Sequence, residues 1–318
     1  MILGIPRGYF LYDYKKFTEE LFKNTDIKLY FGKENSDEII AMGSRTVVDE
    51  ACIPIKLLVG QINKLKENCD FILVPRIMKD FKGKWLCPKL LGLPEIAVSD
   101  ENQENLIITE PIYFDDKRKC KKTFAKIFKS LNIDKRIFEK NFKSAYEIQR
   151  NFAYGLKKYE IEASWEFVPP VPAQGEIILP NTKKVFLAGH CYNIYDKFFN
   201  GNIIKKLDDL GIEAITENKV NPVDRENVIK EANLIKKPFW EAFVRTFGSA
   251  LYLKDKVDGI IYLSSFSCGT DSFITEMIKI YIPDIPIMVL KLDEHKGSAG
   301  YETRLEAFSD LLERRQAS

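Results

Sequence analysis

Short apolar runs alternate with segments of helical periodicity along most of this chain of 318 residues. Such alternation is typical of a parallel α/β sheet with crossover helices. The strongest helical pattern runs from about residue 54 to 67, where apolar residues recur three and four positions apart. We predict strands at residues 2–5, 28–31, 71–74, 95–98, 106–108, 184–189, 213–216, 259–263 and 287–290.

The pattern divides into two α/β halves with a helical stretch between them. We predict an N-terminal α/β domain at residues 1–115, a helical segment and linker at 116–175, and a C-terminal α/β domain at 176–318 that closes on a helix from about 303 to 314. A proline-rich passage at 168–172 breaks the helical periodicity, as a linker does. The two halves share one layout of strands and turns without a close sequence repeat.

Charge and targeting signals exclude several classes of partner. Lys and Arg number 48 against 46 Asp and Glu, a net charge of +2, which predicts neither nucleic acid nor a membrane as a partner. The first residues lack the basic region and apolar stretch of a signal peptide, and no segment approaches the ~18 apolar residues of a membrane span. We therefore expect a cytoplasmic protein, whose six cysteines serve as thiols, metal ligands or catalytic groups rather than as disulfides.

Three cysteines lie in turns beside a proline or a glycine. Cys52 and Cys87 are each followed within two positions by a proline, and Cys268 is followed by a glycine. Each falls between α/β elements, where loops from different strands meet at one edge of a sheet. Three thiolates gathered there would suit an iron–sulfur cluster, because soft sulfur donors bind iron. Ordinary buried thiols are the alternative, since the chain has no C-x-x-C pair and the spacing offers no test.

The sequence beside two of these cysteines predicts how helices begin. Cys52 would stand at the start of the helix that follows it, where the helix dipole stabilises a thiolate. After Cys268, a glycine lets the chain approach a bulky ligand, and Asp271 or Ser272 is expected to cap a helix from about residue 273 to 281.

The other three cysteines suit different roles. Cys69 leads directly into a predicted strand, so we expect it to be a packing residue. Cys120 lies in a cationic stretch that indicates a solvated helix face, although nearby cations would also lower its pKa. Cys191 follows His190 at the end of a strong predicted strand, where a further ligand could enter.

Passages at residues 4–7, 50–56, 189–196, 267–273, 293–295, 299–300 and 303–308 carry a family resemblance. Together they resemble the acyl-CoA dehydratase activase-related proteins, a DUF2229-like family. That family is similar to the iron–sulfur subunits of 2-hydroxyacyl-CoA dehydratases and to the double-cubane cluster proteins. The resemblance runs in order from Met1 to about Leu312.

The resemblance implies two Rossmann-like or flavodoxin-like parallel-sheet domains joined by a helical segment. It also implies that Cys52, Cys87 and Cys268 hold a [4Fe-4S] cluster, which receives electrons from an ATP-dependent activase. A double-cubane [8Fe-9S] cluster would need six thiolates, so a single cluster with one open position is the more economical interpretation. Family members usually have proline where Cys191 stands, and we expect Cys191 to lie near the cluster without binding it.

Histidines and arginines near predicted strand ends are further candidates. His190 and His295, the two histidines of the chain, are candidates to transfer protons during catalysis. The alternative is a structural role, such as His295 held by the neighbouring carboxylates of Asp293 and Glu294. Arg7 and Arg76 each follow a proline after a predicted strand and would bind an anionic substrate or form salt bridges. The chain has no glycine-rich phosphate loop, so we expect the activase to be a separate polypeptide.

These expectations describe an iron–sulfur electron-transfer protein, either a 2-hydroxyacyl-CoA dehydratase-like enzyme or a component of an ATP-dependent reductase. Two alternatives stay open: a non-catalytic regulatory or scaffold partner of the activase with a structural cluster, and a metal-free α/β protein that binds a small molecule. The sequence also leaves open whether the substrate is an acyl-CoA and whether the chain forms a homodimer or pairs with a related subunit.

Overall fold

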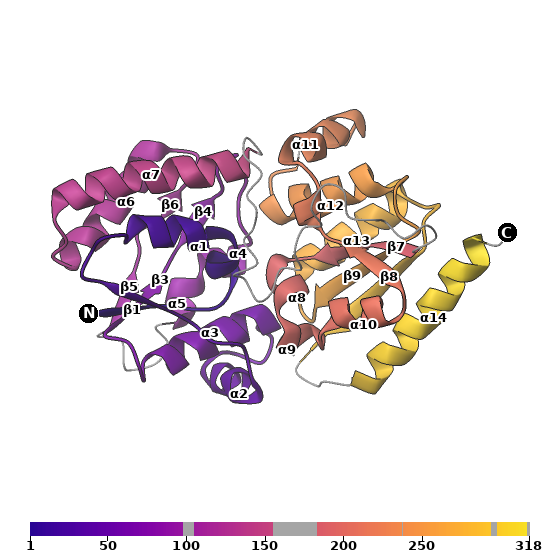
Figure 1. Ribbon diagram of the computed structural model, residues 1–318, viewed down its shortest axis with the longest axis horizontal. Coiled ribbons are helices and arrows are strands. Elements are labelled where there is room, and N and C mark those ends of the chain that lie inside the picture. Colours follow the sequence, from indigo (N-terminus) through magenta and orange to yellow (C-terminus); the bar gives the residue numbers. More distant parts are fainter. Residues whose placement is uncertain (98–104, 155–182, 237, 294–297, 317–318) are drawn as a thin grey trace. The chain divides into compact units, whose positions relative to one another are not determined.

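The computed structural model describes residues 1–97, 105–154, 183–236, 238–293 and 298–316 (Figure 1). The chain divides into two units: unit 1 contains Met1–Lys157 and Phe239–Glu241, and unit 2 contains Lys158–Pro238 and Ala242–Ser318. All paired strands in the sheets of the described residues are parallel, which confirms the predicted α/β fold. The predicted linker at 168–172 lies outside the described residues.

Unit 1 is built on a four-stranded sheet in the order β2-β1-β3-β5, with a two-stranded sheet of β4 and β6 beside it. The central strands β1 and β3 are buried over three of their four residues, because helices cover both faces of a parallel sheet. The predicted strands at 2–5, 28–31, 71–74 and 106–108 match the structure end to end. The strands are β1 (Ile2–Ile5), β2 (Lys28–Phe31), β3 (Phe71–Val74), β4 (Ile77–Lys79), β5 (Leu106–Ile108) and β6 (Ile112–Tyr113).

Helices lie on both faces of the larger sheet of unit 1, with α1, α6 and α7 above it and α2 and α3 below it in Figure 1. α3 carries Pro54 in its first turn, where a missing N–H costs nothing and the fixed φ suits a helix. The helices are α1 (Tyr9–Leu21), α2 (Asp37–Thr46), α3 (Ile53–Leu65), α4 (Pro88–Leu91), α5 (Leu93–Ala97), α6 (Lys117–Ser130) and α7 (Lys135–Ala153).

The predicted helical stretch after residue 115 forms α6 and α7, which pack with α1 in unit 1. Each of the two helices begins at an aspartate, Asp116 or Asp134, whose carboxylate accepts backbone N–H groups of the first turn. An aromatic cluster lies between the helices and the sheet; within it, the rings of Tyr14 and Phe114 stack with centroids 4.5 Å apart. The described helices of this stretch are therefore part of the core of unit 1.

The predicted strand at residues 95–98 is wrong. Residues up to Ala97 belong to the short helix α5, and Val98 lies outside the described residues. Pro94 and Glu95 both favour a helix at this point, because they occupy the first turn, where proline fits and a carboxylate interacts well with the helix dipole. A short apolar run cannot be assigned to strand or helix from its periodicity alone.

Unit 2 is built on one four-stranded sheet in the order β10-β9-β7-β8. β9 is buried along its whole length and β7 over all but one residue, as expected for central strands covered on both faces. The four strands predicted here are all present, with ends that differ by two residues at most. They are β7 (Lys183–Gly189), β8 (Ile212–Ile215), β9 (Gly259–Ser265) and β10 (Ile287–Leu292).

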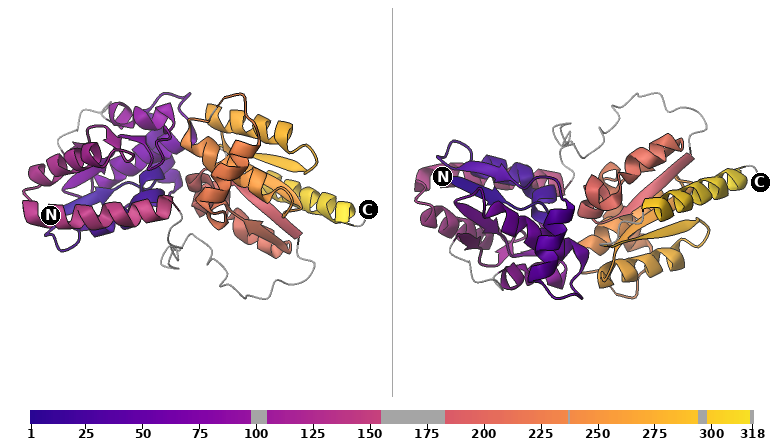
Figure 2. Two further views of the ribbon diagram at one scale, coloured as in Figure 1. Left: turned by 90° about the horizontal axis from the view of Figure 1, so that it is seen from above. Right: turned by 90° about the horizontal axis from the view of Figure 1, so that it is seen from below.

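The helices of unit 2 also cover both faces of their sheet. α12 and α13 lie on one face, and α10 and α14 lie together on the other, as the view from below in Figure 2 shows. The predicted closing helix is part of α14, whose Phe308 lies so close to Gly259 of β9 that a methyl group there would come within 2.9 Å of its ring. The helices are α8 (Cys191–Tyr195), α9 (Lys197–Asn200), α10 (Ile203–Asp209), the 3₁₀ helix η1 (Glu217–Lys219), α11 (Pro222–Glu231), α12 (Glu241–Leu253), α13 (Gly269–Tyr281) and α14 (Ser298–Gln316).

The two units share one strand order, which confirms the predicted similarity of layout. In each larger sheet the first strand along the chain pairs with the second on one side and with the third on the other. The strand order therefore reverses direction once in each sheet, between β1 and β3 in unit 1 and between β7 and β9 in unit 2. Open parallel sheets bind ligands at the carboxyl ends of the strands at such switch points.

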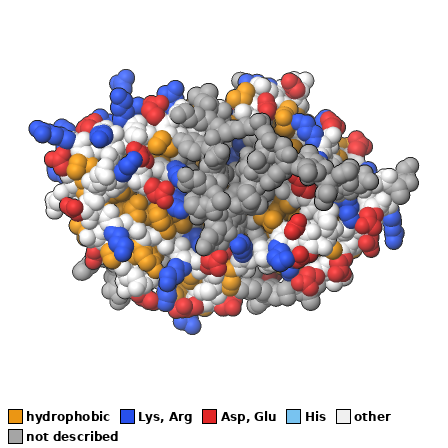
Figure 3. Space-filling model, viewed as in Figure 1, with side chains coloured by type: hydrophobic (Ala, Val, Ile, Leu, Met, Phe, Trp, Pro, Cys, Tyr) orange, Lys and Arg blue, Asp and Glu red, His pale blue; other side chains and the backbone are white. Residues whose placement is uncertain are grey.

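The described surface is mixed in charge. On the face drawn in Figure 3, the described Lys and Arg side chains are interspersed with Asp and Glu. This distribution accords with the net charge of +2. Within the described ranges, no helix has the length and apolar character needed to cross a membrane.

Candidate functional site

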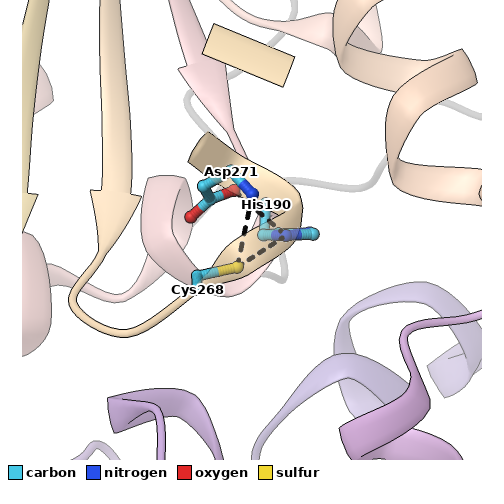
Figure 4. A group of neighbouring side chains, drawn as sticks. All are labelled: His190, Cys268 and Asp271. Carbon is cyan, nitrogen blue, oxygen red and sulfur yellow. Dashed lines mark hydrogen bonds and ion pairs between the residues drawn. The ribbon is translucent and has the colours of Figure 1, made fainter. Parts of the chain in front are cut away.

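His190, Cys268 and Asp271 form a compact group of side chains in unit 2 (Figure 4). His190 directly follows β7, while Cys268 and Asp271 lie at the start of α13, just after β9. Because β7 and β9 are neighbouring parallel strands, their carboxyl ends meet at one edge of the sheet. The group therefore occupies the switch point of the unit 2 sheet, the usual position of a ligand site.

The three side chains bring a nitrogen, a sulfur and a carboxylate oxygen within 4.8 Å of one another. Nε2 of His190 lies 3.2 Å from Oδ1 of Asp271 and 4.0 Å from Sγ of Cys268. The backbone N–H of Asp271 donates to the same sulfur, with 3.5 Å between nitrogen and sulfur. The Cys268 sulfur thus lies between the first turn of α13 and the imidazole ring.

The surroundings of His190 favour its charged form. Only 10% of its side chain is exposed, and burial alone would lower its pKa. The carboxylate of Asp271 and the sulfur of Cys268 outweigh this effect and hold the pKa of His190 well above its usual value. The ring also stacks on Tyr192, with centroids 4.9 Å apart and planes inclined by 15°. These contacts therefore orient the His190 ring and favour its imidazolium form when no other group takes up Nε2.

The predicted cap of α13 is wrong. The helix begins at Gly269, and its N-cap is Cys268, whose sulfur accepts the N–H of Asp271. Asp271 lies inside the first turn, and the hydroxyl of Ser272 donates back to the carbonyl of Cys268. The sequence pointed to Asp271 or Ser272 as the cap because aspartate and serine are common N-cap residues, whereas cysteine is not.

Asp271 is instead a fully buried member of the site. Its Oδ1 accepts a hydrogen bond from the hydroxyl of Tyr262 at 3.0 Å, and its Oδ2 accepts one from the backbone N–H of Ser265 at 2.9 Å. Both donors belong to β9, so the strand fixes the carboxylate in place. Sequence reasoning did not include Asp271 among the site residues; its position one helical turn after Cys268 was the available signal.

Asn193 of α8 ties the turn after β7 to the end of β9. Its side chain is fully buried. The amide Nδ2 donates to the carbonyl of Leu263 at 3.0 Å, and Oδ1 accepts a hydrogen bond from the hydroxyl of Ser265 at 2.8 Å. These two bonds hold together the segments that carry His190 and Cys268.

The other two predicted cluster ligands belong to unit 1, and each is the N-cap of a helix. Cys52 precedes α3 and is 7% exposed, whereas Cys87 precedes α4 and is partly exposed. Cys52 belongs to an apolar cluster along α3, and Leu90 of α4 packs against the same cluster. In unit 1, α4 and the start of α3 thus pack against the same group of apolar side chains. Cys268 belongs to unit 2.

The remaining cysteines are buried. Cys69 lies in the apolar cluster of α3, which confirms its predicted packing role. The prediction that Cys120 lies on a solvated face is wrong, because Cys120 begins the buried stripe of α6 that continues through Phe124 and Ile127. Burial raises the pKa of the Cys120 thiol well above its usual value. Cys191 is the first residue of α8, beside His190, and its predicted proximity to a cluster stays a prediction.

The predicted arginines have local partners. Arg76 forms an ion pair with Glu95, so the salt-bridge alternative is confirmed for this residue. Arg7 is buried, and its Nε donates to the hydroxyl of Tyr12 at 3.1 Å. His295 lies outside the described residues, and its catalytic role stays a prediction.

The fold and this group of side chains define a parallel α/β protein of Rossmann or flavodoxin type, with a His–Cys–Asp group at the carboxyl edge of one sheet. The chain belongs to the family described as CoA enzyme activase uncharacterised domain (DUF2229), whose model matches residues 2–220. The activase-related family predicted from the motifs is therefore confirmed. The match includes Cys52, Cys87 and His190 and ends before Cys268.

No curated protein matches the chain. Two solved structures each cover 98% of this chain over 99% of their own length: a manganese-bound mutant of a periplasmic metal binding protein from Candidatus Liberibacter asiaticus, 10% identical, and a metal-free mutant periplasmic metal binding protein from the same organism, 11% identical. Both have a TM-score of 0.27, at which the likeness carries no argument about this chain.

Proposed function

We propose that this member of the activase-related family is an iron–sulfur redox protein that resembles 2-hydroxyacyl-CoA dehydratase components. In this proposal Cys52, Cys87 and Cys268 hold a [4Fe-4S] cluster. A separate ATP-dependent activase supplies low-potential electrons for a difficult reduction or dehydration, and the family to which the chain belongs supports a relationship with CoA enzyme activases. We also propose a cytoplasmic location, where thiols stay reduced.

The observation that carries the proposal is the shared position of the three cysteines, because each is the N-cap of a helix. The first N–H groups of a helix have no partner within it, and the sulfur of Cys268 accepts one of them, from Asp271. The dipole of a helix as long as α3 or α13 also favours negative charge at this end, whereas α4 has only four residues and adds little. Thiolates are the ligands that iron–sulfur clusters take, so the donor set fits such a cluster. The other three cysteines, Cys69, Cys120 and Cys191, are not N-caps.

Around the sulfur of Cys268 the residues of the chain suit redox chemistry. When bound, a cluster would supply single electrons, and three thiolates would leave one iron open to a substrate atom. The N–H of Asp271 donates to the Cys268 sulfur, and hydrogen bonds of this kind tune the potential of a cluster. His190, held protonated beside Asp271, would give a proton to a substrate bound near Cys268.

Anaerobic iron and sulfide analysis tests the cluster. We expect about four irons and about four sulfides per wild-type chain, as a [4Fe-4S] cluster requires. Replacing any proposed ligand, in the variants Cys52→Ala, Cys87→Ala and Cys268→Ala, should remove most of both. Cys69→Ala is the matched control and should keep them, because Cys69 is a packing residue. A folded wild-type protein without iron and sulfide would favour the metal-free alternative.

A second measurement separates a redox component from a regulatory partner. The cluster-loaded protein is mixed with a CoA enzyme activase, ATP and a strong reductant. We expect ATP-dependent reduction of the cluster, seen as bleaching of its visible absorbance, because a redox component must accept the electron. A cluster that stays oxidised while the activase hydrolyses ATP would favour the structural cluster of a scaffold protein.

A further inference from the structure

The His–Cys–Asp group has the composition and spacing of a site for one metal ion. We propose that unit 2 binds a single transition-metal ion, of the Zn²⁺ or Co²⁺ type, through Nε2 of His190, Sγ of Cys268 and a carboxylate oxygen of Asp271. This inference goes beyond the proposed function and does not rest on it. Because both use the sulfur of Cys268, a chain holds either the single ion or the cluster.

Two of the three distances between the ligand atoms are close to those that one ion requires, and all three atoms lie within 4.8 Å of one another. Bonds of about 2.0 Å to nitrogen and oxygen and about 2.3 Å to sulfur, arranged as a tetrahedron, place neighbouring ligand atoms about 3.3 to 3.6 Å apart. The 3.2 Å between His190 and Asp271 matches this spacing. The 4.0 Å between His190 and Cys268 exceeds it by a few tenths of an ångström, which a small rotation of the partly exposed Cys268 side chain removes.

Neighbouring residues already orient two of the three ligands, as outer contacts do in metal sites. Tyr262 and Ser265 donate to the two oxygens of Asp271. Stacking on Tyr192 fixes the plane of the His190 ring. The ion would therefore meet side chains that need little reorganisation, which favours binding.

The site also leaves room for chemistry. Three protein ligands satisfy three of the four positions around a tetrahedral ion, the arrangement of catalytic rather than structural zinc sites. The partly exposed Cys268 stands at the carboxyl edge of the sheet and gives an ion a path of entry. The competing explanation is an ion pair of protonated His190 with Asp271, which excludes a metal ion because both use Nε2.

Cobalt binding to a protein that cannot build the cluster tests the proposal. The full chain with Cys52→Ser and Cys87→Ser loses two proposed cluster ligands in unit 1 and keeps the His–Cys–Asp group. Titrated anaerobically with Co²⁺, this parent should develop a thiolate-to-cobalt charge-transfer band and the visible bands of tetrahedral cobalt. The signal should saturate at a single ion per chain, and Zn²⁺ should abolish it. A folded parent without this spectrum overturns the proposal.

Variants in the same background identify the ligands. Cys268→Ser should remove the charge-transfer band, and His190→Gln should weaken cobalt binding by at least about tenfold, since even outer-shell changes cost that much. Cys191→Ser is the matched control, because this buried thiol lies next to His190 and should leave the spectrum unchanged. Circular dichroism checks folding. A spectrum that survives Cys268→Ser overturns the assignment, whereas a wild-type chain without iron and sulfide affects only the proposed cluster.

Discussion

Oδ1 of Asp271 lies 3.2 Å from Nε2 of His190 and 3.0 Å from the hydroxyl of Tyr262. One buried oxygen therefore contacts a residue that follows β7 and a residue within β9. The other oxygen accepts the N–H of Ser265. When His190 is charged, all three of these neighbours are hydrogen-bond donors, so the position requires a side chain that has acceptors only.

The first prediction is that Asp271→Asn destabilises the protein. An amide has one acceptor oxygen and an NH₂ group, so a donor would face Ser265 N–H or the pair of His190 and Tyr262. We expect the free energy of unfolding to fall by about 2–4 kcal/mol, the range for breaking a buried charged interaction. Urea unfolding measures it. Asp284→Asn, on the exposed surface, should change stability by less than about 0.5 kcal/mol; equal effects would refute the role of Asp271.

The second prediction concerns the reactivity of the thiols. In cluster-free protein under reducing conditions, Cys87 and Cys268 should react with iodoacetamide before the other four cysteines, because only these two are partly exposed. Cys120 should react last, since it is fully buried and burial raises its pKa. Mass spectrometry of peptides after timed labelling gives the order. Early labelling of Cys120 would show that α6 does not hold it in the core.

Strands were predictable because buried parallel strands are continuous apolar runs bounded by turns. β1 and β3 match the prediction at both ends, and β7 and β9 differ only at their tips. The prediction of a strand at 95–98 was wrong because α5 begins at Leu93, with Pro94 in its first turn. The prediction that Cys120 faces solvent was also wrong. Its neighbours in sequence are cationic, but Cys120 is the first residue of the buried apolar stripe of α6.

The site was only partly predictable. Each of His190 and Cys268 follows an apolar strand, a local pattern that the sequence displays. Their proximity depends on β7 and β9 being neighbours in the sheet, which no local pattern encodes. The role of Asp271 depends on donors from Tyr262 and Ser265 of β9, and so it appears only after the chain has folded.

The third prediction is a pH dependence set by Asp80. Burial raises the pKa of its carboxyl group from 3.8 to about 6. The backbone N–H groups of Lys82 and Lys84 donate to its Oδ1 and lower the pKa, but this effect is smaller than that of burial. Between about pH 4 and about pH 6 the folded state therefore keeps a proton that the unfolded chain has released. Stability should fall as pH rises through this window, by roughly 2–3 kcal/mol in total.

The variant Asp80→Asn isolates this effect. Its amide oxygen can still accept both N–H groups, while the titrating proton is absent. The difference in unfolding free energy between variant and wild type, measured by urea unfolding at several pH values, should grow in favour of the variant from about pH 4 to about pH 6 and then stay constant. A difference that does not change with pH would show that Asp80 titrates normally.

The last prediction concerns Gly43 and Gly60, where α2 and α3 cross in unit 1. A methyl group on Gly60 would lie 1.9 Å from the carbonyl oxygen of Ile39, and one on Gly43 would lie 1.7 Å from that of Lys56. Backbone cannot move aside as a side chain can, so Gly60→Ala should cost at least about 3 kcal/mol. Gly300→Ala is the control, because nothing lies within 4 Å of its added methyl group and α14 should gain up to about 1 kcal/mol of helix propensity. Thermal and urea unfolding compare the two variants. Cys52 is the N-cap of α3, so a Gly60→Ala protein of wild-type stability would mean that these helices do not hold Cys52 in the position described.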